Sequence, residues 1–386
     1  MKIMLLCEGD AENIDGSFSG TSNSIVQHLR RAGDEVTCFD CDLLGMKRYI
    51  GAMRTFTTNR TRWGSRFRFG PTGFAMRTRV AQNHFDKRHF QPDVILQFGA
   101  TFDAPGGDTV PYFLYCDSNI RVSQRGAQTG FSSASTLSPS EVEEIAEREL
   151  RVYERATGIF TISEYLRQSF IDDFGMHPDK VWAVGAGPNI DINDLPPRAP
   201  AEVPTILFVG AAFERKGGDL LLRAFTRVKE RVPNARLVII GPEQVPASIP
   251  GVESLGFLRK TVPEDLAALR QAYATATVFC LPTRFEPFGI AYLEAMFNRV
   301  PCIGPDAWAV PEMVVDGKTG LTFRAEDVDA LTRCLLRLLE NPDEARRLGE
   351  EGRKYAENKF TFVNAVKLMR EAFATAIQDA SIRQLV

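Results

Sequence analysis

The sequence predicts an α/β protein made of two doubly wound parallel sheets, each with helices on both faces. Two observations carry this prediction. Short apolar runs alternate with amphipathic segments along the 386 residues, which is the pattern of βαβ units. Near the middle, residues 188–204 (PNIDINDLPPRAPAEVP) carry five prolines and no helical period, as a stiff linker does. The composition, with 44% hydrophobic residues, 25% charged residues and a net charge of −3, is ordinary for a globular chain.

Six apolar runs of the first half are expected to form strands. They are residues 2–7, 35–40, 93–99, 111–116, 158–163 and 181–187. The first run lies in the start MKIMLLCEGD and is shorter than the ~7–15 residues of a signal-peptide core, so we expect a buried strand there. No apolar run approaches the roughly 20 residues that cross a bilayer.

The second half repeats the pattern. Strands are expected at 205–210, 236–241, 278–282, 301–304 and 320–323, with amphipathic helices at 218–232 and 327–342. We place the domains and their connections at 1–188 (first domain), 189–204 (linker), 205–361 (second domain) and about 362–386 (a C-terminal helix that packs back on the first domain). Because parallel sheets bind ligands beyond the carboxyl ends of their strands, the two domains are expected to face each other across a cleft.

One helical segment, EPFGIAYLEAMF, holds two carboxylates in apolar surroundings. Gly289 bares the backbone where the helix begins, and the free N–H groups of a helix start suit phosphate or sugar oxygens. Glu294 lies two turns further along, where burial without a partner is costly, so a ribose diol would satisfy it. Glu286 could accept hydrogen bonds from sugar hydroxyls. The alternative is that Glu294 pairs with Arg299 and that Glu286 only caps the helix.

A basic loop follows the predicted strand at 205–210. Arg215 and Lys216 precede two glycines and an amphipathic helix. A lysine at a strand-to-helix turn with bare backbone suits a diphosphate. The loop is neither a P-loop nor a GxGxxG fingerprint, so nucleotide binding of those two types is not indicated. An exposed basic turn without a ligand is the alternative.

Taken in order and spacing, VG-x5-KGG, the strand RLVIIG, E-x7-E and VVDGKTGLTF resemble the retaining family 4 glycosyltransferases (glycosyl transferases group 1), over roughly residues 205–325. The resemblance implies the GT-B fold, in which two Rossmann-like domains face each other across a cleft. It implies that Lys216 binds the donor diphosphate and that Glu294 holds the ribose hydroxyls. It implies that Glu286 and the amides of Phe288, Gly289 and Ile290 hold the donor sugar. It also implies that the backbone around Phe257 meets the nucleobase.

The sequence departs from the family pattern in two places. Ala211 replaces the arginine that usually follows the VG pair, and we expect Arg215 or Arg284 to supply the missing charge. In YFLYCDSN, Asp117 stands where many members carry a histidine near the reacting sugar. We expect Asp117 to hold a sugar hydroxyl or to stabilise positive charge at the anomeric carbon; a helix-capping or turn aspartate is the alternative.

The loop after the first strand contains two glycines, Gly16 and Gly20. They let the chain approach the expected cleft, and the resemblance places this loop beside the diphosphate and the acceptor. A turn that binds no ligand is the alternative.

We therefore expect a retaining glycosyltransferase that moves a sugar from a nucleoside-diphosphate donor, UDP-sugar before GDP-sugar, to a hydroxyl of a glycan or lipid-linked acceptor. Catalysis is assigned to Asp117, Lys216 and Glu286. Neutralisation of the diphosphate by Lys216 and helix amides predicts that no metal is needed. The candidate metal pair is Asp40 and Asp42, with a solvated turn as its alternative. Two other functions stay open: a nucleotide-sugar epimerase of the same fold and a catalytically silent binding module.

Residues 47–88 form a basic tract with eleven Lys or Arg and one acid. Trp63, Phe67, Phe69 and Phe74 are interleaved with the charges, which suits an anionic membrane surface or an anionic acceptor. A mobile basic surface is the alternative. Nucleic acid binding is not expected, because the total charge is balanced and no RNA-binding motif is present.

The seven cysteines are scattered along the sequence. Cys38 and Cys41 form a C-x-x-C without a second pair, so we expect buried thiols rather than a redox or zinc site. Reduced thiols favour a cytoplasmic location, and the basic tract favours a peripheral position on the inner face of the membrane.

Overall fold

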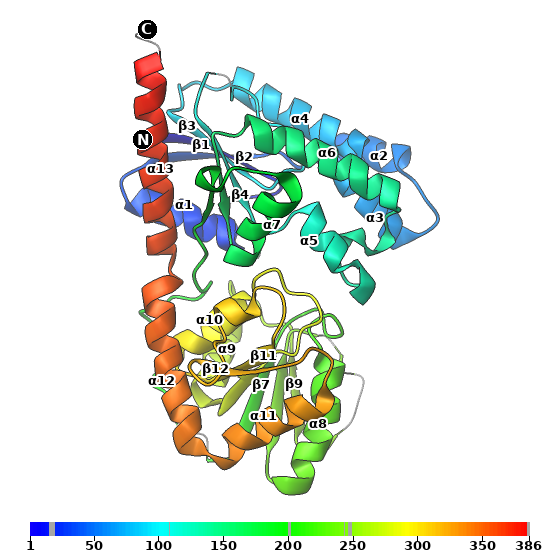
Figure 1. The fold of residues 1–386 in the computed structure, drawn as a ribbon, viewed down its shortest axis with the longest axis vertical. Coiled ribbons are helices and arrows are strands. Elements are labelled where there is room, and N and C mark those ends of the chain that lie inside the picture. Colours follow the sequence, from blue (N-terminus) through cyan, green and yellow to red (C-terminus); the bar gives the residue numbers. More distant parts are fainter. Residues whose placement is uncertain (15–19, 108, 200–201, 243, 246–248, 384–386) are drawn as a thin grey trace. The chain divides into compact units, whose positions relative to one another are not determined.

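The computed structural model describes the whole chain except residues 15–19, 108, 200–201, 243, 246–248 and 384–386 (Figure 1). The chain divides into two compact units. The first unit comprises Met1–Gly185 together with Phe362–Val386, and the second comprises Ala186–Thr361. Each unit is built around its own six-stranded sheet.

The sheet of the first unit has the strand order β2-β1-β3-β4-β5-β6, and all its pairings are parallel. Its strands are β1 (Lys2–Cys7), β2 (Glu35–Asp40), β3 (Val94–Phe98), β4 (Tyr112–Cys116), β5 (Gly158–Thr161) and β6 (Val181–Ala183). Every residue of β3, β4 and β5 is buried, as expected for strands covered on both faces.

The helices of the first unit flank this sheet. They are α1 (Thr21–Arg31), α2 (Gly45–Arg54), α3 (Arg60–Phe69), α4 (Pro71–Asp86), α5 (Ile120–Arg125), α6 (Pro139–Arg155), α7 (Glu164–Phe174) and the C-terminal α13 (Phe362–Arg383). Phe373 of α13 lies edge-on to Phe113 of β4 and Phe160 of β5, so the end of the chain packs on the first sheet. In Figure 1, α13 is the red helix beside α1.

Local sequence signals explain where helices begin. Ser138 caps α6, because its hydroxyl accepts from the N–H of Glu141 while the Glu141 carboxylate accepts from the N–H of Ser138. Pro139 occupies the first helical position, where its missing N–H costs nothing.

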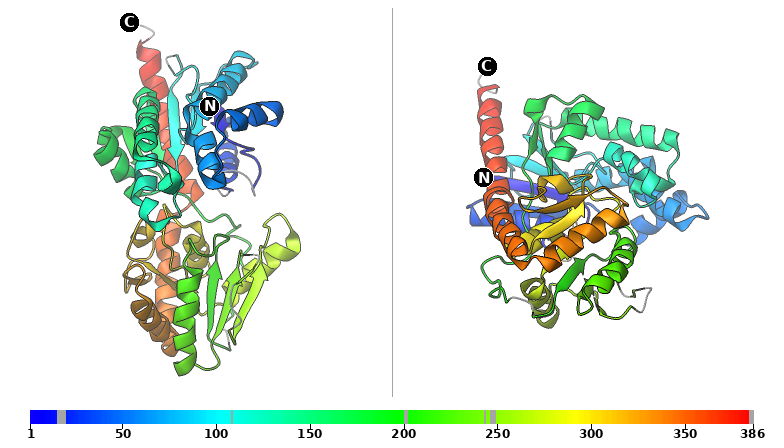
Figure 2. Two further views of the ribbon diagram at one scale, coloured as in Figure 1. Left: turned by 90° about the vertical axis from the view of Figure 1, so that its right-hand side faces the viewer. Right: turned by 60° about the horizontal axis from the view of Figure 1, so that its bottom comes forward.

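The sheet of the second unit has the order β12-β11-β10-β7-β8-β9 and is also parallel throughout. Its strands are β7 (Thr205–Val209), β8 (Arg236–Ile240), β9 (Val252–Gly256), β10 (Val278–Cys280), β11 (Cys302–Pro305) and β12 (Gly320–Phe323). The helices are α8 (Gly218–Arg231), α9 (Pro263–Thr275), α10 (Ile290–Phe297), α11 (Val328–Glu340) and α12 (Pro342–Lys359). The left view of Figure 2 shows the green to yellow-green strands β7, β8 and β9 side by side.

All eleven strands that the sequence predicts are present, most of them a residue or more shorter, so the two-sheet α/β prediction is confirmed. The sequence prediction missed β9, an edge strand whose residues are at least partly exposed and which therefore lacks a continuous apolar run. The predicted helices 218–232 and 327–342 correspond to α8 and α11. Within the described ranges, no helix has the length and apolar character to cross a bilayer.

Candidate active site

Two loops meet at the carboxyl edge of the second sheet. One follows β7 and the other follows β10, and these strands are adjacent and parallel, so their loops emerge on the same side. The loops are joined by hydrogen bonds: the Arg284 N–H donates to the Arg215 carbonyl (2.9 Å), and the Arg215 guanidinium donates to the Phe285 carbonyl (2.9 Å). The predicted donor residues Arg215, Lys216, Arg284 and Glu286 are thereby brought together.

A glycine allows this close approach. Gly217 follows Lys216 with φ +73°, and a Cβ built on it would lie 1.9 Å from the Pro282 carbonyl oxygen. Any side chain there would separate the two loops. Gly217 is also the N-cap of α8, so the chain turns into the helix directly after the lysine.

Lys216 and Glu286 form an ion pair across the two loops. Both side chains are largely buried, with 13% and 8% of their surfaces exposed. Burial lowers the pKa of the Lys216 ammonium, and the Glu286 carboxylate opposes that shift. A buried pair of this kind holds a cation in a fixed position with its charge already compensated, so an incoming anion would compete with Glu286 for the ammonium.

The N-terminus of α10 lies beside this pair. Gly289 is its N-cap with φ +114°, and a Cβ there would lie 2.7 Å from the Tyr292 ring and 3.3 Å from Cγ of Glu286. The N-cap position is held by a glycine, which has no side chain to cap the helix, and the Glu286 carboxylate pairs with Lys216, so the alternative that Glu286 only caps the helix is wrong. Helix α10 begins at Ile290, after the buried Phe288, and the first N–H groups of a helix have no intrahelical acceptor. In α10 the N–H of Tyr292 already donates to the Gly289 carbonyl.

Glu294 is 3% exposed and has partners within the unit. Its carboxylate pairs with the Lys260 ammonium and accepts a hydrogen bond from the Tyr273 hydroxyl at 3.0 Å. Arg299 instead pairs with Glu350, so the alternative pairing of Glu294 with Arg299 is wrong. The expectation that Glu294 lacks a protein partner is wrong as well. A carboxylate offers about four lone-pair sites, so two bonds leave room for a ribose hydroxyl; the ribose role stays a prediction.

The two arginines proposed to replace the charge missing at Ala211 have different surroundings. Both terminal nitrogens of Arg284 donate to Asp219, at 2.6 and 2.7 Å, and its Nε lies 2.9 Å from Glu326. Two acids therefore compensate the Arg284 charge. Arg215 has no carboxylate partner among the residues that the structure describes, so the geometry favours Arg215 for this role.

Phe257 follows β9 directly and is 58% exposed, on the approach to α9. Sequence reasoning missed Lys260 and Tyr273, the partners of Glu294. The signal for Lys260 was its position three residues after Phe257, whose backbone the resemblance had placed at the nucleobase.

Asp117 and Gly20 belong to the first unit. Asp117 follows β4, and burial raises the pKa of its carboxyl, although the positive charge of Arg68 opposes the shift. The cap of α5 is Asn119, whose side chain accepts from the Val122 N–H at 2.8 Å, so the helix-capping alternative for Asp117 is wrong. Gly20 is the N-cap of α1 with φ +85°, whereas Gly16 lies outside the described residues.

The carboxyl edge of the first sheet carries a charge cluster that the sequence did not reveal. Glu8, directly after β1, lies 3.6 Å from Nε of both Arg68 and Arg77. Arg77 is only 1% exposed, and its Nε also lies 3.8 Å from Asp42. Asp40 accepts from the backbone N–H groups of Gly9 and Asp42, which makes it a loop-stabilising residue. Over the described ranges, no three His, Cys, Asp or Glu side chains gather as metal ligands.

Comparison with known proteins identifies the second unit most clearly. Residues 191–355 match the family described as glycosyl transferases group 1. A GDP-mannose-dependent alpha-(1-6)-phosphatidylinositol monomannoside mannosyltransferase of Mycolicibacterium smegmatis is 29% identical over 53% of this chain and 59% of that protein. An MMP alpha-(1->4)-mannosyltransferase of Mycolicibacterium hassiacum is 31% identical over 56% of this chain and 53% of that protein. The chain thus spans somewhat more than half the length of these relatives.

The likeness in structure extends further along the chain. A sucrose-phosphate synthase of Thermosynechococcus elongatus superposes with a TM-score of 0.73 over 98% of this chain and 100% of that one, at 17% identity. At this identity the likeness concerns the fold alone. Residues 191–355 thus match the glycosyl transferases group 1 family, and the architecture of two parallel six-stranded sheets is the GT-B fold.

Proposed function

We propose that this protein is a retaining glycosyltransferase acting on a nucleoside-diphosphate sugar. The bond between the anomeric carbon and the β-phosphate oxygen breaks, and a bond to an acceptor hydroxyl oxygen forms on the same face of the sugar. The acceptor proton passes to the departing phosphate oxygen. The observation that carries the proposal is the buried Lys216–Glu286 pair beside the N-terminus of α10.

The chemistry is electrostatic. Lys216 and the first N–H groups of α10 stabilise the negative charge that grows on the leaving diphosphate. Arg215 adds a second positive charge at the same loop. This supply of positive charge supports transfer without a metal ion, which a transfer assay in excess chelator tests directly.

Glu286 and Glu294 position the donor. Glu286 accepts hydrogen bonds from sugar hydroxyls once the diphosphate draws Lys216 toward itself. Glu294 accepts from the ribose with the lone pairs that Lys260 and Tyr273 leave unused. The backbone around Phe257 meets the nucleobase. On the acceptor side, Asp117 holds a hydroxyl near the anomeric carbon, and its raised pKa suits a carboxyl that exchanges a proton or a hydrogen bond with the sugar.

The preferred donor is a GDP-activated sugar. The sequence favoured UDP before GDP, but the M. smegmatis relative is named for its dependence on GDP-mannose. The same name supports a lipid-linked acceptor, since it describes a phosphatidylinositol monomannoside. All seven cysteines are free thiols, which supports a reducing compartment such as the cytoplasm.

The test begins with thermal shifts in GDP, UDP and their sugars, followed by transfer assays with the donor that raises the midpoint most. Lys216→Ala should abolish the shift, and Lys354→Ala, at an exposed lysine of the same unit, should leave it unchanged. If no nucleotide raises the midpoint, the protein is a silent module. If the donor sugar is epimerised without an acceptor, the protein is an epimerase and the proposal is wrong.

A further inference from the structure

Helix α2 is attached to the first unit through a glycine. Gly51 is its one buried residue, and a Cβ there would lie 2.8 Å from the Phe67 ring and 3.3 Å from the Met76 sulfur. The Trp63 indole N–H donates to the Ala52 carbonyl at 2.8 Å, which fixes the same side of the helix to α3. The smallest residue of α2 therefore faces the protein.

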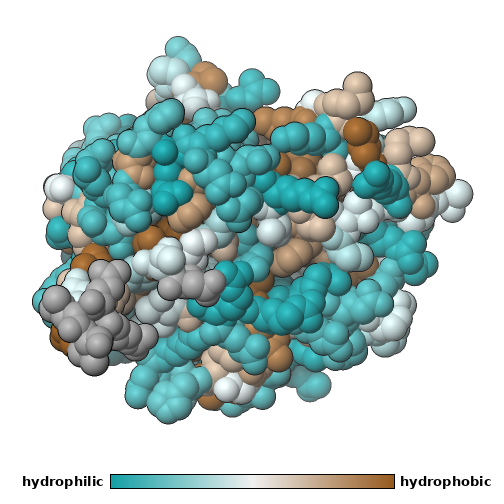
Figure 3. Space-filling view, turned by 90° about the horizontal axis from the view of Figure 1, so that it is seen from above, coloured by the Kyte–Doolittle hydropathy of each residue, from teal (hydrophilic) through white to brown (hydrophobic). Residues whose placement is uncertain are grey.

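Its large apolar residues face away from the protein. Met46, Tyr49, Ile50 and Met53 follow the i, i+3, i+4, i+7 spacing of one helix face and are 72%, 63%, 42% and 58% exposed. At about 100° per residue, Met46, Tyr49 and Met53 lie within about 40° of the direction opposite Gly51. Leu44 directly before α2 and Phe56 just after it are each 61% exposed as well. Figure 3 shows apolar residues gathered toward the right of the molecule, where α2 lies in Figure 1.

This arrangement reverses the usual one. A surface helix of a globular domain normally turns its apolar stripe toward the core. Six of the twelve large apolar side chains that are exposed in the described part of the chain lie between residues 44 and 56. A contiguous exposed patch of this kind marks an interaction surface.

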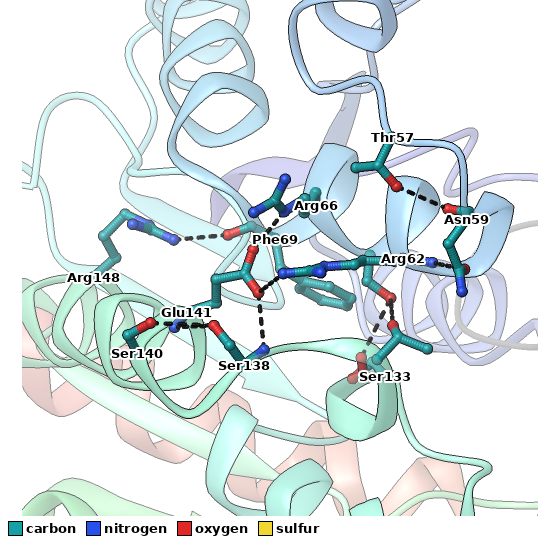
Figure 4. Close-up of polar contacts among 12 residues, drawn as sticks. Thr57, Asn59, Arg62, Arg66, Phe69, Ser133, Ser138, Ser140, Glu141 and Arg148 are labelled. Carbon is teal, nitrogen blue, oxygen red and sulfur yellow. Dashed lines mark hydrogen bonds and ion pairs between the residues drawn. The ribbon is translucent and has the colours of Figure 1, made fainter.

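The charges in the sequence stretch that holds the patch are all positive. Residues 44–79 hold nine Lys or Arg and no acid. Arg62 and Arg66 of α3 are compensated by Glu141 of α6, as Figure 4 shows, and Arg148 of α6 donates to the Phe69 carbonyl at 2.9 Å. These bonds tie α3 to α6 and leave Arg60, at the start of α3, outside this network.

The basic residues next to the patch are not compensated in this way. Lys47, Arg54 and Arg60 are exposed, and none has a carboxylate partner within the part of the chain that the structure describes. Arg48 approaches Asp42 only at 3.8 Å. Long cationic side chains that flank an apolar helix face can keep their charged ends at lipid phosphates while the apolar face enters the bilayer surface.

We propose that α2 docks the protein on an anionic lipid bilayer, with the helix lying in the plane of the interface. Met46, Tyr49, Ile50 and Met53 enter the boundary between headgroups and acyl chains, and Lys47, Arg54 and Arg60 contact phosphate groups. A second copy of the chain fits the surface less well, because pairing two such faces would bring like charges together. The proposal rests on the proposed transferase function in one respect, because a lipid-borne acceptor gives the protein a reason to bind a membrane. Vesicle binding is measured without donor or turnover, so its outcome can be told apart from that of the transfer assay.

The structure also corrects the sequence-based view of residues 47–88. The aromatic residues expected on the surface, Trp63, Phe67, Phe69 and Phe74, are all partly buried. Trp63 supports Phe56 edge-on at 5.3 Å between ring centroids, and Phe67 lies beneath Gly51. The membrane-facing side chains are those of 44–56 instead.

The experiment is flotation of the full chain with phosphatidylcholine vesicles, with and without about 30% phosphatidylglycerol. We expect binding to the anionic vesicles that declines as salt is raised, and little binding to the neutral ones. Tyr49→Asp/Met53→Asp should lower the partition into anionic vesicles by about tenfold or more. Val363→Asp/Ile382→Asp on α13 changes two residues of matching exposure, 64% and 60%, and should bind like the wild type.

A second pair of variants tests the charges. Lys47→Glu/Arg54→Glu should lower anionic-vesicle binding by about tenfold, whereas Arg31→Glu/Lys367→Glu, at exposed sites of the same unit, should change it far less. Circular dichroism and the nucleotide-induced thermal shift should be unchanged in all four, since none alters the donor site. The proposal is overturned if the wild type floats with neither vesicle, if the α2 variants float as well as the wild type, or if light scattering shows a dimer that Tyr49→Asp/Met53→Asp dissociates without any lipid binding.

Discussion

Helices α10 and α2 are similar in length and composition, but α10 is buried and α2 is exposed. Both are short, mostly apolar and accompanied by a glycine at a close contact, yet six of the eight residues of α10 are buried and only one of the ten residues of α2 is. In α10 the glycine stands at the helix start and bares backbone N–H groups, whereas in α2 it forms the contact with the protein and turns the large side chains outward.

The difference extends to the charges. The buried carboxylate of Glu294 is paired inside its unit by Lys260 and Tyr273. The cations beside α2 remain in water, where an unpaired charge costs little. A buried charge must be compensated by the fold itself, while an exposed one is left for a partner. This contrast suggests that the donor site is pre-organised and that the α2 surface is completed only by its ligand.

The largest effect is expected when a buried partner is removed. Lys216→Met keeps most of the side-chain volume but leaves the Glu286 carboxylate buried without its ammonium. We expect the free energy of unfolding of the second unit to fall by about 3–5 kcal/mol, and the transfer rate to fall by about 10²–10³-fold. Chemical denaturation and initial-rate assays measure the two quantities.

The double variant Lys216→Met/Glu286→Gln separates stability from chemistry. Removing both charges should restore most of the stability, because no unpaired charge is left, while transfer stays slow. If the double variant transfers sugar as fast as the wild type, the pair serves only the fold and the catalytic assignment is wrong.

A smaller effect is expected at Glu294. Glu294→Ala should weaken binding of the nucleoside diphosphate by about 1–3 kcal/mol, the range of a hydrogen bond to a charged group, measured by titration calorimetry. Lys260→Met removes one of the two protein partners and keeps the Glu294 carboxylate, so it should reduce stability more than nucleotide affinity. Glu350→Ala, which breaks the exposed pair with Arg299, should change neither appreciably. Wild-type affinity in Glu294→Ala would exclude the ribose role.

The glycine contact of α2 can be tested by adding volume. Gly51→Val should destabilise the first unit by about 1–3 kcal/mol, because the new side chain meets the Phe67 ring. Gly64→Ala is the matched control, since a Cβ at Gly64 of α3 meets no atom within 4 Å. It should stabilise that helix by about 0.5–1 kcal/mol. Equal stabilities of the two variants in urea unfolding would contradict the contact.

The smallest effect is expected in how the stability of the protein depends on pH in the acid range. Burial alone would raise the pKa of Glu141, but hydrogen bonds from Ser138, Arg66 and Arg62 lower it from 4.5 to about 2. A lowered folded-state pKa stabilises the fold above about pH 4.5, and this contribution is lost as the pH falls toward 2. When the pH is lowered from about 6 to about 3, the thermal midpoint of Glu141→Gln should therefore fall by about 2–4 °C less than that of the wild type. An identical loss in both proteins would show that Glu141 does not couple folding to pH.

Much of the fold was predictable because its signals are local. Strands such as β3 and β4 are continuous apolar runs, since helices cover both faces of their sheet. The edge strand β9 has no such signal, because its side chains meet water. The capping box of α6, Gly217 next to Lys216 and Gly289 shortly after Glu286 are likewise local features of the chain.

The partners of the charged residues were not predictable in the same way. Arg299 stands only five positions after Glu294 but bonds to Glu350 instead, while Lys260 reaches Glu294 from 34 positions away. Arg284, a candidate to supply the positive charge missing at Ala211, forms ion pairs with Asp219 and Glu326. Such pairings depend on which loops share a sheet edge, and a charge pattern does not contain that information.

Order and spacing along the chain thus suffice to establish the two parallel sheets, the lysine loop and the paired glutamates, because backbone periodicity and short motifs are properties of neighbouring residues. Which charges end up compensated, and that α2 shows its apolar side to solvent, follow from packing between distant segments. The reason is physical: burial and ion pairing are set by three-dimensional neighbours, and the contacts of Gly51 and Ala52 with α3 and α4 leave the large apolar side chains of α2 toward solvent.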